Sequence, residues 1–536
     1  MTTPAVPLSS ARPLLLEALR TSDKVDLVVI GGGATGLGVA LDAALRGLSV
    51  VLLESHDFAK GTSSRATKLV HGGVRYLAQG NIALVREALH ERSTLLHNAP
   101  HLARPLPFVM PSYKCWETPF FGIGLKMYDA LAGRAGLGST EFLSARQARQ
   151  CLPGVRQDGL KGGVKYWDGQ FDDARLALAL ARTAAAQGAL VLNYCPVTEL
   201  LHEGGKVSGV RCQDAESGGS FTVRARCIVN ATGVWVDQIR EKDGAATGRS
   251  TEPMVAPSQG VHLVVDRGFL PGDHALLVPK TDDGRVLFAV PWLGKLILGT
   301  TDTPRGDLSR EPDAFDHEVN FILGEAAKYL ERAPSRADVL SKWVGLRPLV
   351  RPPRNEGRST QKISREHTVL VSPSGLVTVT GGKWTTYRAM AEDVLEKCVD
   401  SGLLDRLPPS ETSDFLLVGA APGSATRATI TAPPGIDAYG TEAAYVQALP
   451  GSDRELAPGL TGAMVRFGVR HEYARTVEDV LARRSRLLFL DARLAATLAP
   501  DVAAIIADEL REEAGRPDVG LADFLELADQ YHTLPS

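Results

Sequence analysis

The chain has 536 residues, enough for two or three domains, and its composition is that of an ordinary globular protein, with 44% hydrophobic and 23% charged residues. A formal net charge of −3 gives no overall attraction for nucleic acid or for an anionic membrane. No run of about 20 apolar residues predicts a transmembrane helix, and PLLLEAL near the N-terminus is too short and too charged for a signal peptide. Six cysteines without a CxxC pair indicate reduced thiols in a cytoplasmic protein and no metal site.

A strand, a glycine turn, a helix and a second strand are predicted by VDLVVIGGGATGLGVALDAALRGLSVVLLES. Gly31, Gly33 and Gly36 fit the GxGxxG pattern, in which glycines let the backbone approach a pyrophosphate at a helix N-terminus. Glu54 ends the second strand near the spacing of about 20 residues expected for a ribose-binding carboxylate. This carboxylate would repel a 2′-phosphate, so the sequence predicts a dinucleotide other than NADP.

Two later segments repeat the order of strand, glycine and helix. The first is RCIVNATGVWVDQI, whose strand ends at Ala231, Thr232 and Gly233, and the second is GLVTVTGGKWTTYRAMAEDVLEKCV. Three such units spread along the chain suit one long cofactor that distant segments contact, which favours FAD over NAD. The glycine pair of the last unit would place the positive end of a helix against the negative charge of a reduced flavin.

The region between these units predicts a second sheet. Short apolar runs at 258–266 and 275–303 are separated by turn residues and predict an antiparallel meander. We expect this sheet to cover the open side of the cofactor and to form the substrate pocket. Residues 401–460 are rich in Pro, Ala, Gly and Thr and predict a linker, whereas helical periodicity from about residue 462 predicts a small helical bundle.

The stretch CWETPFFGIGLKMYDALAG (115–133) is unusually aromatic, with Lys114 directly before it and Lys126 within it. If it were exposed, it would act as an amphipathic anchor at a membrane interface. Nothing in its spacing demands a lipid-facing surface, so the sequence favours a core helix beneath the substrate sheet.

These motifs together resemble the FAD-dependent glycerol-3-phosphate dehydrogenases. The resemblance is carried by the first glycine segment and by GTSSRATKLVHGGVRYL, FDDARLALA, VNATGVWVD, GTTDT, GLRPL and GGKWTTYRAMAEDV. It covers nearly the whole chain after about residue 25, and TVEDVLARRSRLLFLDA is similar to the helical appendix of that family. The implied fold is α/β, with a Rossmann-like FAD-binding domain of the glutathione-reductase and D-amino-acid-oxidase type, an antiparallel β substrate domain and a C-terminal helical domain.

The resemblance also implies a division of the chain. An N-terminal extension (1–25) precedes the oxidoreductase region (26–400). Residues 401–460 form a linker and the start of the appendix, and the C-terminal helical domain follows (461–536). Within the oxidoreductase region, FAD-binding segments are expected at about 26–90, 165–245 and 355–400, and the substrate-binding sheet at about 91–164 and 246–354.

The implied reaction is oxidation of sn-glycerol 3-phosphate to dihydroxyacetone phosphate by hydride transfer to non-covalently bound FAD. Family members pass the electrons to a quinone, or to oxygen in the oxidase branch. The spacing from GTTDT to GLRPL lacks the long insertion of the oxidases, so we expect a quinone acceptor and peripheral attachment to the inner face of the cytoplasmic membrane. The alternatives are a glycerol-3-phosphate oxidase, an amine or amino-acid oxidase of the same fold, and a flavin-bound scaffold or tRNA-modifying partner. A homodimer remains open, and a nucleic-acid partner is not expected because the charge is balanced.

The resemblance implies the cofactor contacts residue by residue. Thr62, Ser63 and Ser64 would lie over the pyrophosphate and the ribityl chain, and His71, Gly72 and Gly73 would line the isoalloxazine. The remaining implied cofactor contacts are Ala34, Thr35, Lys68, Val197, Gly382, Lys383 and Thr385.

The substrate contacts must be fixed donors, because a small phosphorylated triol has two negative charges and little apolar surface. Arg75 with Tyr76, Arg347 and Lys383 are the implied donors. His262 matches the active-site histidine of the family and is expected to remove the hydroxyl proton. Arg347 and Lys383 could instead stabilise an alkoxide while water or His262 accepts the proton, and the sequence leaves these roles open.

Overall fold

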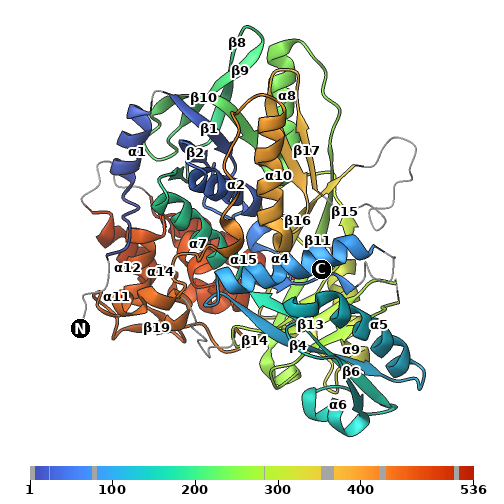
Figure 1. The fold of residues 1–536 in the computed structure, drawn as a ribbon. Coiled ribbons are helices and arrows are strands. Elements are labelled where there is room, and N and C mark those ends of the chain that lie inside the picture. The colour runs from blue at the N-terminus through green and yellow to red at the C-terminus, as the bar shows by residue number, and fades with distance from the viewer. Residues whose placement is uncertain are drawn as a thin grey trace.

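The computed structural model describes residues 6–22, 24–74, 81–282, 284–351, 367–421, 430–511 and 518–535. Two large sheets and a group of C-terminal helices make up the described chain (Figure 1). The first sheet lies at the top of the view, the second at the lower right, and the C-terminal helices at the lower left beside α7 (Asp173–Ala186).

The first sheet has a parallel centre. Its main path runs in the order β17-β18-β10-β1-β2-β7, and the hairpin β8–β9 extends it from β10. The strands are β1 (Lys24–Ile30), β2 (Val50–Leu53), β7 (Leu190–Leu192), β8 (Val197–Glu203), β9 (Lys206–Gln213), β10 (Ser220–Asn230), β17 (His367–Val371) and β18 (Leu376–Gly381). Strands β1, β2, β7, β10 and β18 pair in parallel, whereas β17 and β9 run antiparallel to their neighbours.

Both faces of β1 are covered, which explains its nearly continuous apolar sequence. Leu27 and Val29 belong to the cluster formed with α2 (Ala34–Leu45), α7 and α10 (Tyr387–Asp400). Val28 and Ile30 point to the other face, where the cluster includes residues of α1 (Arg12–Thr21) and α8 (Val236–Thr247). The N-terminal extension is therefore packed against the first sheet through a ten-residue helix.

The second sheet runs in the order β15-β11-β14-β13-β12-β4-β6-β3, with β16 on β11 and β5 on β6. Its strands are β3 (Leu69–Val70), β4 (Ala103–Ser112), β5 (Glu141–Ser144), β6 (Gly162–Phe171), β11 (Val255–Asp266), β12 (Ala275–Val278), β13 (Leu287–Trp292), β14 (Lys295–Gly299), β15 (Thr303–Pro304) and β16 (Ser341–Val350). The predicted meander is confirmed, since β12, β13, β14 and β11 pair antiparallel in that order.

Four helices flank the second sheet: α4 (Ile82–Asn98), α5 (Glu117–Ala132), α6 (Ala145–Cys151) and α9 (Asp316–Tyr329). The expectation that α5 is a core helix was wrong. Trp116 just before it and Phe120, Ile123 and Met127 within it are all more than half exposed, whereas Leu125 packs inward. The spacing of the exposed residues puts them on one face of the helix, and this periodicity is the same for a core face as for a surface face. No helix in the described ranges is long and apolar enough to cross a membrane.

The C-terminal helices are α11 (Ala443–Gln447), α12 (Gly462–His471), a π-helical segment (Asp479–Arg484), α13 (Leu487–Leu490), α14 (Ala492–Glu509) and α15 (Leu521–His532). They share one core cluster with Trp292 and Trp343 of the second sheet. The predicted linker is not an extended connection where it is described. Leu404 and Leu417 pack into the cluster around α2 and α10, and Tyr439 packs among the C-terminal helices.

Close packing at the turn after β1 can be tested by substituting a glycine. A Cβ on Gly36 would lie 2.0 Å from the carbonyl oxygen of Gly31, so Gly36→Ala should destabilise the fold by about 1–3 kcal/mol through overpacking. A Cβ on Gly324, at an exposed position of α9, meets no atom within 4 Å, so Gly324→Ala should be neutral or stabilise by up to about 1 kcal/mol. Urea unfolding of the two variants measures this difference, and equal unfolding midpoints would contradict it.

Candidate active site

An elongated groove of about 340 Å³ follows the carboxyl ends of the parallel strands β1, β2, β10 and β18. This edge of a doubly wound sheet is where such folds bind nucleotides. The groove is lined by thirteen of the residues predicted to contact the cofactor: Gly31, Gly33, Ala34, Thr35, Glu54, Thr62, Ser63, Val197, Ala231, Thr232, Gly233, Gly382 and Lys383.

The glycine turn brings the backbone to the groove. Gly31 has φ +109°, and a Cβ there would lie 2.7 Å from the carbonyl oxygen of Ala231, so both the conformation and the space require glycine. Helix α2 starts just after Gly33, which has no side chain to cap it, and Ala34 N–H donates to Ser63 Oγ at 2.9 Å. The positive end of the helix faces the groove, where it would attract an anion. Glu54 is fixed at the end of β2, since its carboxylate accepts hydrogen bonds from the backbone N–H of Gly32 (2.6 Å) and His56 (2.9 Å).

These features fit FAD. A backbone cradle without side chains suits a pyrophosphate, the helix N-terminus suits its charge, and the carboxylate suits a ribose. Several further groove residues were not predicted, among them Lys60, Trp235, Arg310, Pro348 and Trp384. The guanidinium of Arg310 lies 4.4 Å from the ring centre of Trp235, so two segments far apart in sequence together form one wall.

A second cavity of about 200 Å³ adjoins the groove and shares Thr62, Lys383 and Trp384 with it. Its other lining residues are Arg65, Ala66, Thr67, Leu69, His71, Gly260, His262, Phe288, Gly345, Arg347 and Thr385. The three predicted catalytic residues, His262, Arg347 and Lys383, therefore meet in one small space although the sequence places them on three separate segments.

The register of β11 and β16 explains how two of them meet. His262 lies opposite Trp343, Gly260 opposite Gly345, and Ser258 opposite Arg347. Because alternate residues share a face of a strand, His262 and Arg347 lie on the same face of this strand pair. The two glycines between them carry no side chain, and this gap forms part of the cavity.

His262 is held firmly and kept neutral. Its ring stacks on Trp343 at 4.9 Å between centres, and its Nε2 lies in hydrogen-bond contact with Thr67 Oγ1 at 2.9 Å. Burial, followed by the charges of Lys68 and Arg347, holds the pKa of His262 well below its usual range. Its Nδ1 has no hydrogen-bond partner within the described part of the chain. A neutral imidazole of this kind can accept a proton from a ligand.

Arg347 is oriented by main-chain oxygens. Its Nη1 donates to Gln259 O (3.1 Å) and its Nη2 donates to Thr301 O (2.9 Å). A Cβ on Gly260 would lie 2.2 Å from Nη2, so glycine at this position leaves room for the guanidinium. About a fifth of the Arg347 side chain is exposed, and its Nη1 also pairs with Asp302 Oδ1 at 3.4 Å, so the guanidinium is held in one position at the cavity.

Some predicted contacts lie elsewhere. Lys68 lines neither cavity, because its side chain is fully buried and its Nζ donates to Asp173 (2.8 Å) and to Ser64 O (2.7 Å). The prediction that Lys68 contacts the cofactor is corrected accordingly. Ser64 is also buried away from both cavities, and Gly36, Gly72 and Gly73 shape the nearby backbone without lining either one. Arg75 and Tyr76 lie outside the described residues.

Arg65, Thr67 and Phe288 also line the second cavity, and they were not predicted from the sequence. Arg65 and Thr67 belong to GTSSRATKLVHGGVRYL, so the segment itself gave the signal. Thr67 faces the cavity and Lys68 beside it is buried, but Arg65, Ala66 and Thr67 line the cavity in a row, so no strand alternation marks the difference. No local signal marked Phe288, which lies on a strand of the meander.

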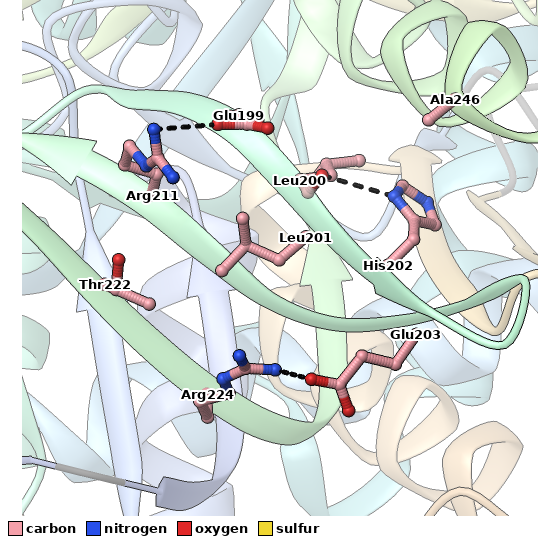
Figure 2. A pocket seen from close by; sticks show the side chains of 9 residues that line it. All are labelled: Glu199, Leu200, Leu201, His202, Glu203, Arg211, Thr222, Arg224 and Ala246. Atoms are coloured by element: carbon pink, nitrogen blue, oxygen red, sulfur yellow. Dashed lines mark hydrogen bonds and ion pairs between the residues drawn. The ribbon is translucent and has the colours of Figure 1, made fainter.

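A further hollow of about 460 Å³ lies over the hairpin β8–β9, beside β10 and α8 (Figure 2). Its charged side chains already pair with one another, since Arg211 contacts Glu199 at 3.4 Å and Arg224 contacts Glu203. These four side chains are about half exposed or more, and His202 bonds the carbonyl oxygen of Leu200 at 3.2 Å. We assign no ligand to this surface.

Comparison with known proteins gives the class first. A family model described as FAD dependent oxidoreductase matches residues 26–388, and one described as the C-terminal domain of alpha-glycerophosphate oxidase matches residues 410–516. Fold, groove and family model agree, so the protein is an FAD-dependent oxidoreductase, and the predicted fold class and cofactor are confirmed. The second match begins inside the stretch (401–460) that we predicted to hold a linker and the start of the appendix.

Individual relatives show which family of FAD-dependent oxidoreductases this chain resembles. The mitochondrial glycerol-3-phosphate dehydrogenase of Rattus norvegicus is 42% identical over 539 residues, covering 93% of this chain and 72% of that protein. The corresponding Arabidopsis thaliana enzyme is 40% identical over 96% of this chain and 87% of its own. The glycerol-3-phosphate dehydrogenase of Bacillus halodurans, solved in complex with FAD, superposes with a TM-score of 0.75 at 29% identity over 97% of this chain and 98% of that one. This chain belongs to the family of FAD-dependent glycerol-3-phosphate dehydrogenases.

Proposed function

We propose that this protein oxidises sn-glycerol 3-phosphate to dihydroxyacetone phosphate. The observation that carries the proposal is the small cavity that joins the FAD groove through shared residues and is lined by Arg347, Lys383 and His262. Bound FAD supplies the hydride acceptor for such a reaction. The names of the relatives support the same substrate.

The cations of the cavity suit a phosphate. A phosphate monoester carries up to two negative charges and is recognised best by fixed, charge-assisted donors. Arg347 is fixed by its bonds to main-chain oxygens, and Lys383 stands where the cavity meets the groove. Anchoring the phosphate on one side of the cavity would hold the carbinol carbon at the cofactor, which is a large part of the catalytic effect in such reactions.

His262 would take the hydroxyl proton of the substrate. Oxidation of a carbinol removes a hydride from carbon and a proton from oxygen, so a base must stand beside the hydroxyl. The low pKa of His262 keeps the ring unprotonated at neutral pH, and the stack on Trp343 and the contact with Thr67 fix its direction. The positive charges of Arg347 and Lys383 would stabilise the negative charge that develops on the oxygen.

Anaerobic mixing of the FAD-loaded protein with candidate substrates tests the proposal. We expect sn-glycerol 3-phosphate to bleach the flavin absorbance with formation of dihydroxyacetone phosphate. Sarcosine, glycine and D-alanine serve as controls, because an amino-acid oxidase of the same fold would need only one cation for a carboxylate. Bleaching by one of these amines, with none by the phosphate ester, would contradict the proposal.

His262→Asn should lower the rate constant of flavin reduction by about 10²-fold or more, because the amide cannot accept the proton. FAD content and the substrate dissociation constant should stay close to those of the unmodified protein, since Asn keeps a polar contact for Thr67. Stopped-flow absorbance separates the reduction step from binding. An unchanged reduction rate would remove His262 from the chemistry.

We propose further that the electrons pass to a membrane quinone and that the protein sits peripherally on the inner face of the cytoplasmic membrane. The spacing of GTTDT and GLRPL supports a quinone acceptor, as argued above. The exposed face of α5 supports the membrane contact, because Trp116, Phe120, Ile123 and Met127 lie together. The exposed residues Lys114, Lys126 and Arg134 near this helix would complement anionic lipid headgroups.

Ile123→Asp should weaken sedimentation with phosphatidylglycerol-containing vesicles by about tenfold or more, because an apolar contact is replaced by a charge that anionic lipid repels. Leu525→Asp, at an exposed leucine of α15, is the matched control and should bind as the unmodified protein does. Both variants should reduce their flavin normally with glycerol 3-phosphate. Equal vesicle binding by all three proteins would contradict the membrane contact.

The quinone acceptor is tested separately. Release of hydrogen peroxide at the full rate, without a response to ubiquinone, would contradict it.

A further inference from the structure

One short segment of the chain serves both cavities. Between residues 62 and 71, Thr62 and Ser63 line the FAD groove, and Thr67 and His71 line the substrate cavity. The segment begins with a 3-10 turn (Thr62–Ser64) and ends at β3, and the backbone between them is irregular, since Lys68 has φ +65°. The position of residues 65–68 therefore depends on the side chains that bind them rather than on regular hydrogen bonding along a strand or helix.

Asp173, at the start of α7, holds this segment. Its fully buried carboxylate accepts hydrogen bonds from the backbone N–H of Ala66 (3.1 Å) and from Lys68 Nζ (2.8 Å) through one oxygen. The other oxygen accepts from Arg486 Nη2 at 3.0 Å. The Asp173 carboxylate thus joins the segment to Arg486, which lies 313 positions after Asp173 in the chain.

Arg486 comes from the C-terminal helical domain, at the start of α13. Its side chain is 1% exposed, and its Nη2 also donates to the carbonyl oxygen of Ser64 at 2.8 Å. Its Nη1 donates to Ala482 O (2.9 Å), which fixes the guanidinium to its own domain. One arginine side chain therefore bonds both the segment directly and the carboxylate that holds it.

The cluster of Lys68, Asp173 and Arg486 also supports the catalytic histidine. Lys68 Nζ lies 5.0 Å from the ring centre of Trp343, the ring on which His262 stacks. Trp343 in turn donates from Nε1 to Arg65 O at 3.3 Å. Burial is the largest cause that lowers the pKa of Lys68 to about 7, and the nearby charge of Arg486 adds to it. A displaced segment would thus disturb the support of His262 as well as its contact with Thr67.

We propose that Arg486 is a positioning residue through which the C-terminal domain sets the shape of segment 62–71, and so of both the FAD groove and the substrate cavity. Arg486 touches neither the groove nor the cavity and acts through Asp173 and Ser64. The C-terminal domain therefore helps to position the residues that line the active site. The proposal concerns FAD binding as well as turnover, so it can be tested independently of the substrate assigned above.

The test compares Arg486→Lys and Arg486→Met with the same two changes at Arg475. Arg475 is an equally suitable arginine of the C-terminal domain, since it is 4% exposed and its Nε and Nη2 pair with Glu216 at 2.7 Å in the turn between β9 and β10. Changes at both positions remove a buried ion pair between the C-terminal domain and the rest of the chain. Only Arg486 bonds segment 62–71 directly.

Three quantities are measured on the full-length variants: the thermal midpoint, the FAD dissociation constant by flavin fluorescence, and the rate constant of flavin reduction in the FAD-saturated protein. Arg486→Met should weaken FAD binding and slow flavin reduction by about tenfold or more each, because a small displacement of positioned groups has large effects. Arg486→Lys keeps the charge and one donor and should recover part of both losses. The Arg475 variants should lose thermal stability yet stay within about twofold of the unmodified protein in both functional quantities.

Equal FAD affinities and reduction rates in the Arg486 and Arg475 variants would overturn the proposal and leave Arg486 with a role in stability alone. If Arg486→Met does not fold, the comparison of Arg486→Lys with Arg475→Lys decides. Failure of Arg486→Lys to accumulate, where Arg475→Lys does, would assign Arg486 to folding and would equally overturn the proposal. Weaker FAD binding in the Arg486 variants alone would support the positioning role even if no protein, including the unmodified one, reacted with glycerol 3-phosphate. That second result would contradict only the proposed substrate.

Discussion

A cofactor and a substrate that exchange a hydride must lie in contact, so their two cavities must share a wall. In this protein the wall consists of Thr62, Lys383 and Trp384, which line both spaces. The first sheet supplies the cofactor side through its strand ends, and the second sheet supplies the substrate side through β11 and β16. The relative placement of the two sheets is therefore the constraint on which the site depends.

Buried charge is the means by which the structure meets this constraint. Lys68, Asp173 and Arg486 come from three regions of the chain and meet in the interior behind the shared wall. An interior ion cluster contributes little net stability compared with apolar packing, but it is costly to leave incomplete. Such a cluster favours one arrangement of its members over others, which suits a region where small displacements matter.

The local features of the fold were predictable from the sequence. The glycine turn, the carboxylate at Glu54 and the meander follow from spacing and periodicity within short windows, and the predicted catalytic residues His262, Arg347 and Lys383 do meet in one cavity. The burial of Lys68 was not predictable, because its environment depends on Asp173 and Arg486, which no local pattern connects to it. The exposure of α5 was missed for a related reason, since an apolar helix face has the same period whether it packs against the protein or is exposed.

The central claim is that fixed cations in the cavity bind the phosphate and so place the carbinol at the cofactor. It is tested most directly by the second-order rate constants of anaerobic flavin reduction by glycerol 3-phosphate and by glycerol, in the unmodified protein and in Arg347→Ala. We expect the variant to lose about tenfold or more of the preference for the phosphorylated substrate. The lost charge-assisted contact with the phosphate affects glycerol 3-phosphate alone, whereas the lost stabilisation of charge at the carbinol oxygen affects both substrates and cancels in the ratio. A preference for glycerol 3-phosphate that is unchanged in Arg347→Ala would contradict the account.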